Sequence, residues 1–204
     1  MRTIGEIMRL APVIPVLVID DAAEARGIAE ALVEGGLRVL EVTLRTPAAL
    51  DAIREMARVE GAVVGAGTVV DREGLAQSLA AGAEFIVSPG LTETLGAAAV
   101  ASGAPFLPGI ANAGDIMRGL DLGLTHFKFF PAESSGGIAA LKALAGPFGQ
   151  VRFCPTGGIT AESAPRWLAL EPVLCVGGSW IVPKGPADRA AITAAARAAS
   201  ALGG

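Results

Sequence analysis

Short apolar runs recur along the whole chain, and a longer amphipathic segment follows most of them. Their lengths and their Val, Ile and Phe content are typical of buried strands. Their starts lie roughly 19 to 26 residues apart, enough for one strand, one loop and one helix of about three turns. The pattern predicts eight strands, at 12–19, 38–45, 62–69, 85–91, 104–111, 126–133, 151–159 and 174–181.

Capping residues and glycines mark the ends of several predicted helices. The helix within 20–36 begins at an aspartate and stops at a glycine pair, and the helix within 71–82 begins at an aspartate and ends at the single Gly82. For 46–58 the sequence predicts Thr46 as the N-cap and Pro47 as the first helical residue. Segment 187–202 is the last predicted helix, and segment 3–10 predicts an extra helix before the first strand.

Alternating strands and helices indicate a parallel sheet with right-handed crossovers, an α/β fold. Eight similar units in 204 residues predict a single domain, 1–204, folded as a (β/α)8 barrel. We expect the extra N-terminal helix to plug the barrel's N-terminal end. A doubly wound open sheet is the alternative, but eight similar units and no second domain favour closure.

Composition narrows the classes of partner. The net charge of −4 disfavours nucleic acid. No apolar run reaches the ~18 residues of a membrane span, and the N-terminal segment is too short and too charged for a signal peptide, so we expect a cytoplasmic protein. The two cysteines, Cys154 and Cys175, have no metal-ligand spacing and are expected to be small apolar filler. We expect neither a metal nor a cofactor.

The stretch H-F-K-F-F-P-A-E at 126–133 places a lysine between phenylalanines on a predicted buried strand. Residues two apart share a face of a strand, so Lys128 points into the barrel if Phe127 and Phe129 pack on the helices. A surface lysine with a buried stem is the alternative. A desolvated lysine, however, has a lowered pKa and becomes a nucleophile. The lone histidine, His126, begins this strand and is expected to be structural.

A carboxylate and a guanidinium are predicted on the same interior surface. On the strand at 38–45, Leu40, Val42 and Leu44 suit the helix-facing side, which assigns Glu41 and Arg45 to the barrel interior. A structural ion pair is the alternative for these two residues. With Lys128 they form a set that suits a 2-keto acid: the amine attacks the ketone, the carboxylate moves protons and the guanidinium holds the substrate carboxylate.

Two glycine pairs end the last two predicted strands, in P-T-G-G-I and V-G-G-S-W. Glycines let backbone N–H groups approach an anion, and loops after the seventh and eighth strands are the usual phosphate site of such barrels. The stretch G-A-G-T at 65–68 lacks the third glycine of a dinucleotide fingerprint. Its glycines fit a packing turn, and Thr68 can offer a hydroxyl.

Six motifs together resemble one known family: V-L-E-V-T-L-R-T, V-V-G-A-G-T-V, V-S-P-G-L-T, F-K-F-F-P-A-E, V-R-F-C-P-T-G-G-I and L-C-V-G-G-S-W. In this order they are similar to 2-keto-3-deoxy-6-phosphogluconate (KDPG) aldolases, the class I aldolases of the Entner–Doudoroff pathway. The resemblance implies a metal-free (β/α)8 barrel and a homotrimer. It also implies reversible cleavage of a 2-keto acid phosphate to pyruvate and D-glyceraldehyde 3-phosphate.

The resemblance also assigns roles by position. It makes Lys128 the Schiff-base lysine, Glu41 the proton-shuttling residue and Arg45 the carboxylate-binding residue. The pyruvate end of the substrate would contact Thr68, Pro89 and Phe130. The hydroxyl and phosphate end would contact Thr156, Gly157, Gly158, Gly178 and Ser179.

The same residues fit several alternative functions. Within the family, 4-hydroxy-2-oxoglutarate aldolase, oxaloacetate decarboxylase and the 6-phosphogalactonate-specific relative are alternatives. A phosphate-binding barrel isomerase or epimerase would use the same glycine-rich loops but would not need a lysine inside the sixth strand. A non-catalytic effector-binding barrel would have no reason to keep Glu41, Arg45 and Lys128 together.

Overall fold

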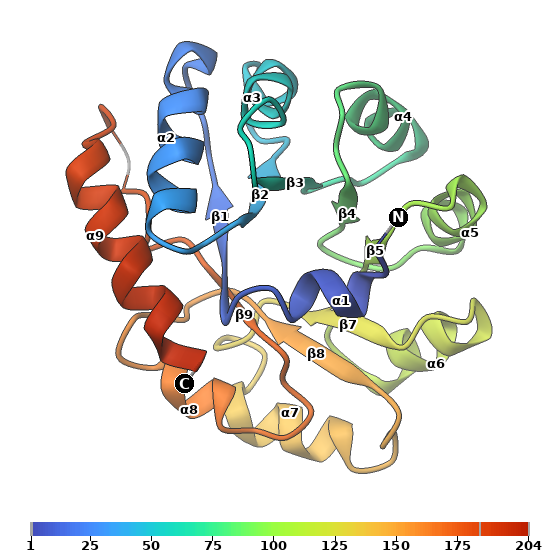
Figure 1. Cartoon of the computed structure of the whole chain (residues 1–204). Coiled ribbons are helices and arrows are strands. Elements are labelled where there is room, and N and C mark those ends of the chain that lie inside the picture. The colour runs from blue at the N-terminus through green and yellow to red at the C-terminus, as the bar shows by residue number, and fades with distance from the viewer. Residues whose placement is uncertain (1, 184, 204) are drawn as a thin grey trace.

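The computed structural model of the chain describes residues 2–183 and 185–203, and within them parallel strands form a ring enclosed by helices (Figure 1). One sheet has the order β5-β4-β3-β2-β1-β9 and the other β6-β7-β8. A parallel bridge between Thr156 and Gly177 joins β8 to β9. The strands are β1 (Val13–Leu17), β2 (Val39–Thr43), β3 (Val63–Gly67), β4 (Phe85–Val87), β5 (Phe106–Leu107), β6 (Gly109–Ile110), β7 (His126–Phe129), β8 (Arg152–Pro155) and β9 (Val176–Gly178).

The predicted fifth barrel strand is divided into β5 and β6 at Pro108. Proline has no N–H to donate to a neighbouring strand, so it interrupts the ladder. Its carbonyl still accepts a hydrogen bond from the Lys128 N–H at 2.8 Å, and Gly109 pairs with Lys128. With β5 and β6 counted as one strand, the eight predicted strands and the barrel are confirmed.

The helices lie outside the strand ring, except for α1 (Figure 1). Asp21 and Asp71 cap α2 and α4 with their side chains, as predicted. The predicted cap at Thr46 is wrong: α3 begins later, with Ala48 as its N-cap, because the Thr46 hydroxyl donates to the Ile19 carbonyl. The helices are α1 (Ile4–Met8), α2 (Ala22–Glu34), α3 (Ala49–Met56), α4 (Arg72–Ala80), α5 (Glu93–Ser102), α6 (Ala113–Asp121), α7 (Gly137–Ala145), α8 (Ala164–Leu168), α9 (Arg189–Ser200) and the 3-10 turn η1 (Ala201–Gly203).

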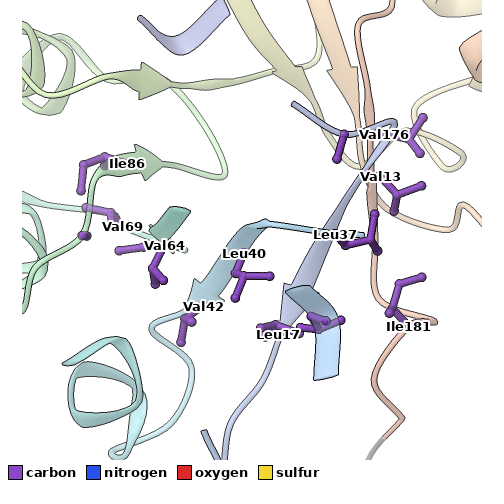
Figure 2. Close-up of a cluster of buried hydrophobic side chains, with 14 of the residues drawn as sticks. Val13, Leu17, Leu37, Leu40, Val42, Val64, Val69, Ile86, Val176 and Ile181 are labelled. Carbon is purple, nitrogen blue, oxygen red and sulfur yellow. The ribbon is translucent and has the colours of Figure 1, made fainter. Parts of the chain in front are cut away.

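Two apolar layers hold the barrel together. The outer layer lies between strands and helices and includes Val13, Leu17, Leu40, Val42 and Val64 (Figure 2). The inner layer fills the N-terminal half of the barrel, where α1 places Ile7 and Met8 against buried residues on or next to the strands: Ile14, Val39, Val63, Phe85, Val87, Leu107, Cys154 and Cys175. The N-terminal helix therefore plugs this end, as predicted, and the inner surface near the carboxyl ends of the strands carries the polar side chains.

Candidate active site

Lys128 and Glu41 face each other inside the barrel. Lys128 comes from β7 and Glu41 from β2, which lie half-way round the ring from each other. The ammonium Nζ donates to Glu41 Oε1 at 3.0 Å, and the residues are only 4% and 3% exposed. Phe127 and Phe129 are buried in the outer layer, so the alternation predicted for this strand holds. The structure thus places a buried amine directly beside a buried carboxylate.

One aromatic ring lies close to the Lys128 ammonium. The ring of Phe130, which follows β7, has its centroid 5.2 Å from Nζ, within range of a cation–π contact.

A buried ion pair is costly to desolvate, and one with few additional hydrogen bonds gives little net stability. This pair has one charge-assisted hydrogen bond between its partners. Such an arrangement is better suited to chemistry than to holding the fold together.

Gly67, which has no side chain, leaves the space that the Glu41 side chain occupies. The φ of Gly67 is not in the positive region, so the backbone does not require glycine there. A Cβ at this position would come within 2.2 Å of Glu41 Oε1 and 2.7 Å of its Cγ. The G-A-G-T glycines were predicted to form a packing turn, and Gly67 fits this prediction. The absence of a side chain at Gly67 leaves room for the Glu41 carboxylate beside Lys128. Sequence reasoning left this residue out of the site.

The prediction that Arg45 shares the interior face of β2 with Glu41 is wrong. The Leu44 N–H still donates to the Gly67 carbonyl of β3, but the Arg45 N–H donates to the Thr43 carbonyl two residues back, so the chain turns after β2 ends at Thr43. Arg45 is exposed at the mouth of the barrel. Its Nε donates to Thr68 Oγ1 at 3.3 Å.

Thr68 holds an unusual backbone conformation. Its φ is 59°, a left-handed value that is rare for a β-branched residue and costs of order 1–3 kcal/mol. The conformation leaves the half-buried Thr68 beside the Arg45 guanidinium. Arg45 and Thr68 thus place a guanidinium and a hydroxyl side by side at the barrel mouth. Pro89 and Phe130 are half-buried after β4 and β7, on the same end of the barrel.

The predicted phosphate-end residues lie at or just after the carboxyl ends of β8 and β9. Thr156 is buried, and its Oγ1 lies 3.8 Å from the Sγ of Cys154 in the lumen. Gly157 and Gly158 have φ values of 103° and 79°, which only glycine adopts freely. Gly178 is buried and leaves room for the Trp180 ring, whereas Ser179 is exposed.

The cysteines lie in the inner layer of the barrel, near the reacting groups, whereas the histidine lies at the far end of β7. A hydrogen bond with Cys154, burial and the nearby Glu41 raise the pKa of Cys175 well above its ordinary value, so it stays a neutral thiol. His126 is half-buried at the opposite end of β7 from Phe129. Burial, and then Arg9 and Arg152, lower its pKa. Both observations agree with the structural roles predicted for these residues.

The described part of the chain contains no cluster of three or more His, Cys, Asp or Glu side chains arranged to hold a metal ion. Among the helices of residues 2–183 and 185–203, none has the length and apolar character needed to cross a bilayer. A cavity of about 780 Å³ lies at the N-terminal end of the barrel, lined by residues that include Arg2, Ile7 and Glu84.

Comparison with known proteins defines the class of enzyme first. Residues 4–195 match the aldolase family model described as KDPG and KHG aldolase. The 2-dehydro-3-deoxy-phosphogluconate aldolase of Zymomonas mobilis is 65% identical over 202 residues, covering 99% of this chain and 97% of the relative.

Two solved structures extend the comparison. A Zymomonas mobilis KDPG aldolase crystallised with 3-phosphoglycerate has a TM-score of 0.97 and 64% identity, covering 99% of this chain and 97% of that chain. A Legionella pneumophila KDPG aldolase, which captured pyruvate as a covalent carbinolamine, has a TM-score of 0.94 and 45% identity and covers 98% of both chains. The chain belongs to the KDPG and KHG aldolase family, and it is a class I aldehyde-lyase.

Proposed function

We propose that this chain cleaves KDPG reversibly to pyruvate and D-glyceraldehyde 3-phosphate, with Lys128 as its Schiff-base nucleophile. The single observation that carries the assignment of Lys128 is the 3.0 Å contact between its Nζ and Glu41 Oε1 in the barrel lumen. An isomerase or epimerase that uses the same glycine-rich loops has no need for an amine at this position. The carbinolamine of the Legionella relative supports a covalent route.

The reaction begins when Glu41 accepts the proton of the Lys128 ammonium, which leaves a neutral amine. The amine attacks the C2 ketone and forms a carbinolamine, and Glu41 then protonates the departing hydroxyl so that water leaves and a protonated imine remains. This imine withdraws electrons from the neighbouring carbon–carbon bond.

Cleavage follows when a base removes the proton of the C4 hydroxyl. The C3–C4 bond breaks, its electron pair moves into the imine to give an enamine, and the aldehyde departs. Protonation of the enamine at C3 gives the pyruvyl imine, which water hydrolyses to pyruvate and the free amine. Because Glu41 is within hydrogen-bonding distance of Nζ, one carboxylate can serve these successive proton transfers.

Binding divides between the two ends of the substrate. Arg45 and Thr68 hold the carboxylate at the barrel mouth, and Pro89 and Phe130 bound the pyruvyl group. At the other end Thr156 contacts the substrate hydroxyls. The backbone of the loops after β8 and β9 receives the phosphate, at Gly157, Gly158, Gly178 and Ser179.

The same lysine chemistry acts on 4-hydroxy-2-oxoglutarate, and the family description includes KHG. Because 4-hydroxy-2-oxoglutarate presents a 2-keto acid to Lys128 but carries no phosphate, we propose this cleavage as a slower second activity. We also propose that the chain forms one catalytic domain, assembles as a homotrimer and works in the cytoplasm without metal or cofactor. Light scattering of the purified protein tests the trimer, and cell fractionation tests the compartment.

A coupled assay tests the proposed function. Pyruvate released from KDPG is measured with lactate dehydrogenase and NADH, and 6-phosphogalactonate-type and 4-hydroxy-2-oxoglutarate substrates are compared in parallel. We expect the highest kcat/KM for KDPG. If none of the three 2-keto acids releases pyruvate, the proposal fails.

A further inference from the structure

A buried tryptophan holds a carboxylate near the glycine loop after β8. Trp167 of α8 is fully buried, and its indole Nε1 donates to Glu133 Oε1 at 2.9 Å. A buried indole N–H needs an acceptor, and here Glu133 supplies it. Glu133 lies in the loop after β7, so this hydrogen bond ties the loop that follows the lysine strand to the helix that follows β8.

The main chain around Glu133 is also joined to the end of β8. The Ala132 N–H donates to the Thr156 carbonyl at 2.8 Å, and the Glu133 N–H donates to the Gly157 carbonyl at 3.1 Å. A Cβ placed on Gly158 would lie 2.8 Å from the Cβ of Glu133. The Gly157–Gly158 loop therefore rests directly on Glu133.

The second carboxylate oxygen of Glu133 lies near the start of α7. This helix has Gly136 as its N-cap, has no side-chain cap and has no acidic residue in its first turn. Oε2 of Glu133 is 3.5 Å from the place that a Cβ of Gly137 would occupy. A negative charge is favourable at the N-terminus of a helix. Trp167 thus holds one oxygen of this exposed carboxylate, and the other oxygen lies near the N-terminus of α7.

We propose that Glu133 is a positioning residue for the phosphate end of the substrate. It holds the Gly157–Gly158 loop in its binding conformation without touching the phosphate, and Trp167 holds Glu133 in turn. This inference rests on the proposed function, because it takes that loop as part of the phosphate site. The loop binds the phosphate equally in the ground state and the transition state, so loosening it raises KM and leaves kcat nearly unchanged.

The test uses Glu133→Ala, Glu133→Gln and Trp167→Phe in the full chain. The matched control is Glu93→Ala, which removes an exposed carboxylate from the first turn of α5. Steady-state kinetics are measured with KDPG and with unphosphorylated 2-keto-3-deoxygluconate, and pyruvate adducts are trapped with borohydride. For Glu133→Ala we expect KM for KDPG to rise about tenfold, the factor for one lost hydrogen bond. The kcat/KM for the unphosphorylated substrate and the trapping rate should not change.

Two further results complete the expectation. Glu133→Gln keeps a carbonyl acceptor for the indole and should restore most of the affinity. Trp167→Phe keeps the buried ring but removes the donor, so it should raise KM for KDPG and be non-additive with Glu133→Ala. The inference is overturned by an unchanged KM in Glu133→Ala and Trp167→Phe, or by equal losses with both substrates. Wild-type protein that leaves KDPG intact would instead refute the proposed function.

Discussion

The side chains of Lys128 and Glu41 meet across the barrel lumen, with Nζ 3.0 Å from Oε1. They are 87 residues apart in the sequence and come from strands on opposite sides of the ring. Both are nearly inaccessible to solvent. Because each charge is buried against the other, the pair links catalysis to stability.

Lys128→Ala should abolish turnover and also lower stability. From the sequence alone, removing a buried amine is expected to leave the fold intact or more stable. The ion pair reverses this expectation, because the variant leaves the Glu41 carboxylate buried without its partner, a loss of about 3 kcal/mol. Urea unfolding measures the free-energy change. The double variant Lys128→Met/Glu41→Gln should recover much of the loss, and a single variant as stable as wild type would contradict the coupling.

Glu41→Gln should separate imine formation from proton transfer. The amide keeps the size of the side chain but cannot accept and return protons, so kcat should fall by ~10²–10⁴. Slow trapping of pyruvate on Lys128 should persist. Single-turnover kinetics with borohydride quenching distinguish the two steps, and a kcat within a few-fold of wild type would remove Glu41 from the proton-transfer role.

Gly67→Ala should lower kcat by displacing the Glu41 carboxylate. The new methyl group would overlap Oε1 and Cγ of Glu41, so the side chain must rotate away from the amine. A shift of about 1 Å in a catalytic group can cost ~10² in rate. Gly149→Ala is the control, since a Cβ there meets nothing within 4 Å and φ is not positive. Equal activity in both variants would show that Glu41 does not depend on Gly67.

His126 should make stability depend on pH in the weakly acidic range. Burial lowers its pKa below 6.5, so the unfolded chain takes up a proton before the folded chain does. The contribution of His126 is therefore present above pH 6.5 and is lost as the pH falls through the folded pKa. The unfolding free energies of wild type and His126→Gln, measured at about pH 7.5 and about pH 5.5, should differ less at the lower pH. A constant difference would contradict the shift.

Periodicity predicted most of the fold because each barrel strand is a short apolar run between turn residues. The same rule of alternation placed Lys128 and Glu41 in the lumen and the flanking Phe127 and Phe129 outside. It failed at Arg45, because alternation holds only as long as the strand continues, and β2 ends at Thr43. Where a strand ends depends on hydrogen bonds to its neighbours, which one sequence does not show.

Other misses have a similar cause. Thr46 has the sequence features of a helix cap, but its hydroxyl donates instead to the Ile19 carbonyl, which is far from it in the sequence. The importance of Gly67 depends on where Glu41 lies on the neighbouring strand. Glu133 ends the predicted strand at 126–133, and its hydrogen bond from Trp167 joins residues far apart in the sequence. Local patterns predicted the elements, whereas these residues are defined by contacts between elements.

The most direct measurement is reductive trapping. Folded protein is incubated with pyruvate and sodium borohydride, digested and mapped by mass spectrometry, with Lys142 as an internal reference lysine on α7. We predict a stable carboxyethyl adduct on Lys128, none on Lys142, and loss of activity in proportion to labelling. An active protein that carries no adduct, or one labelled at a different lysine, would contradict the assignment of Lys128 as the nucleophile.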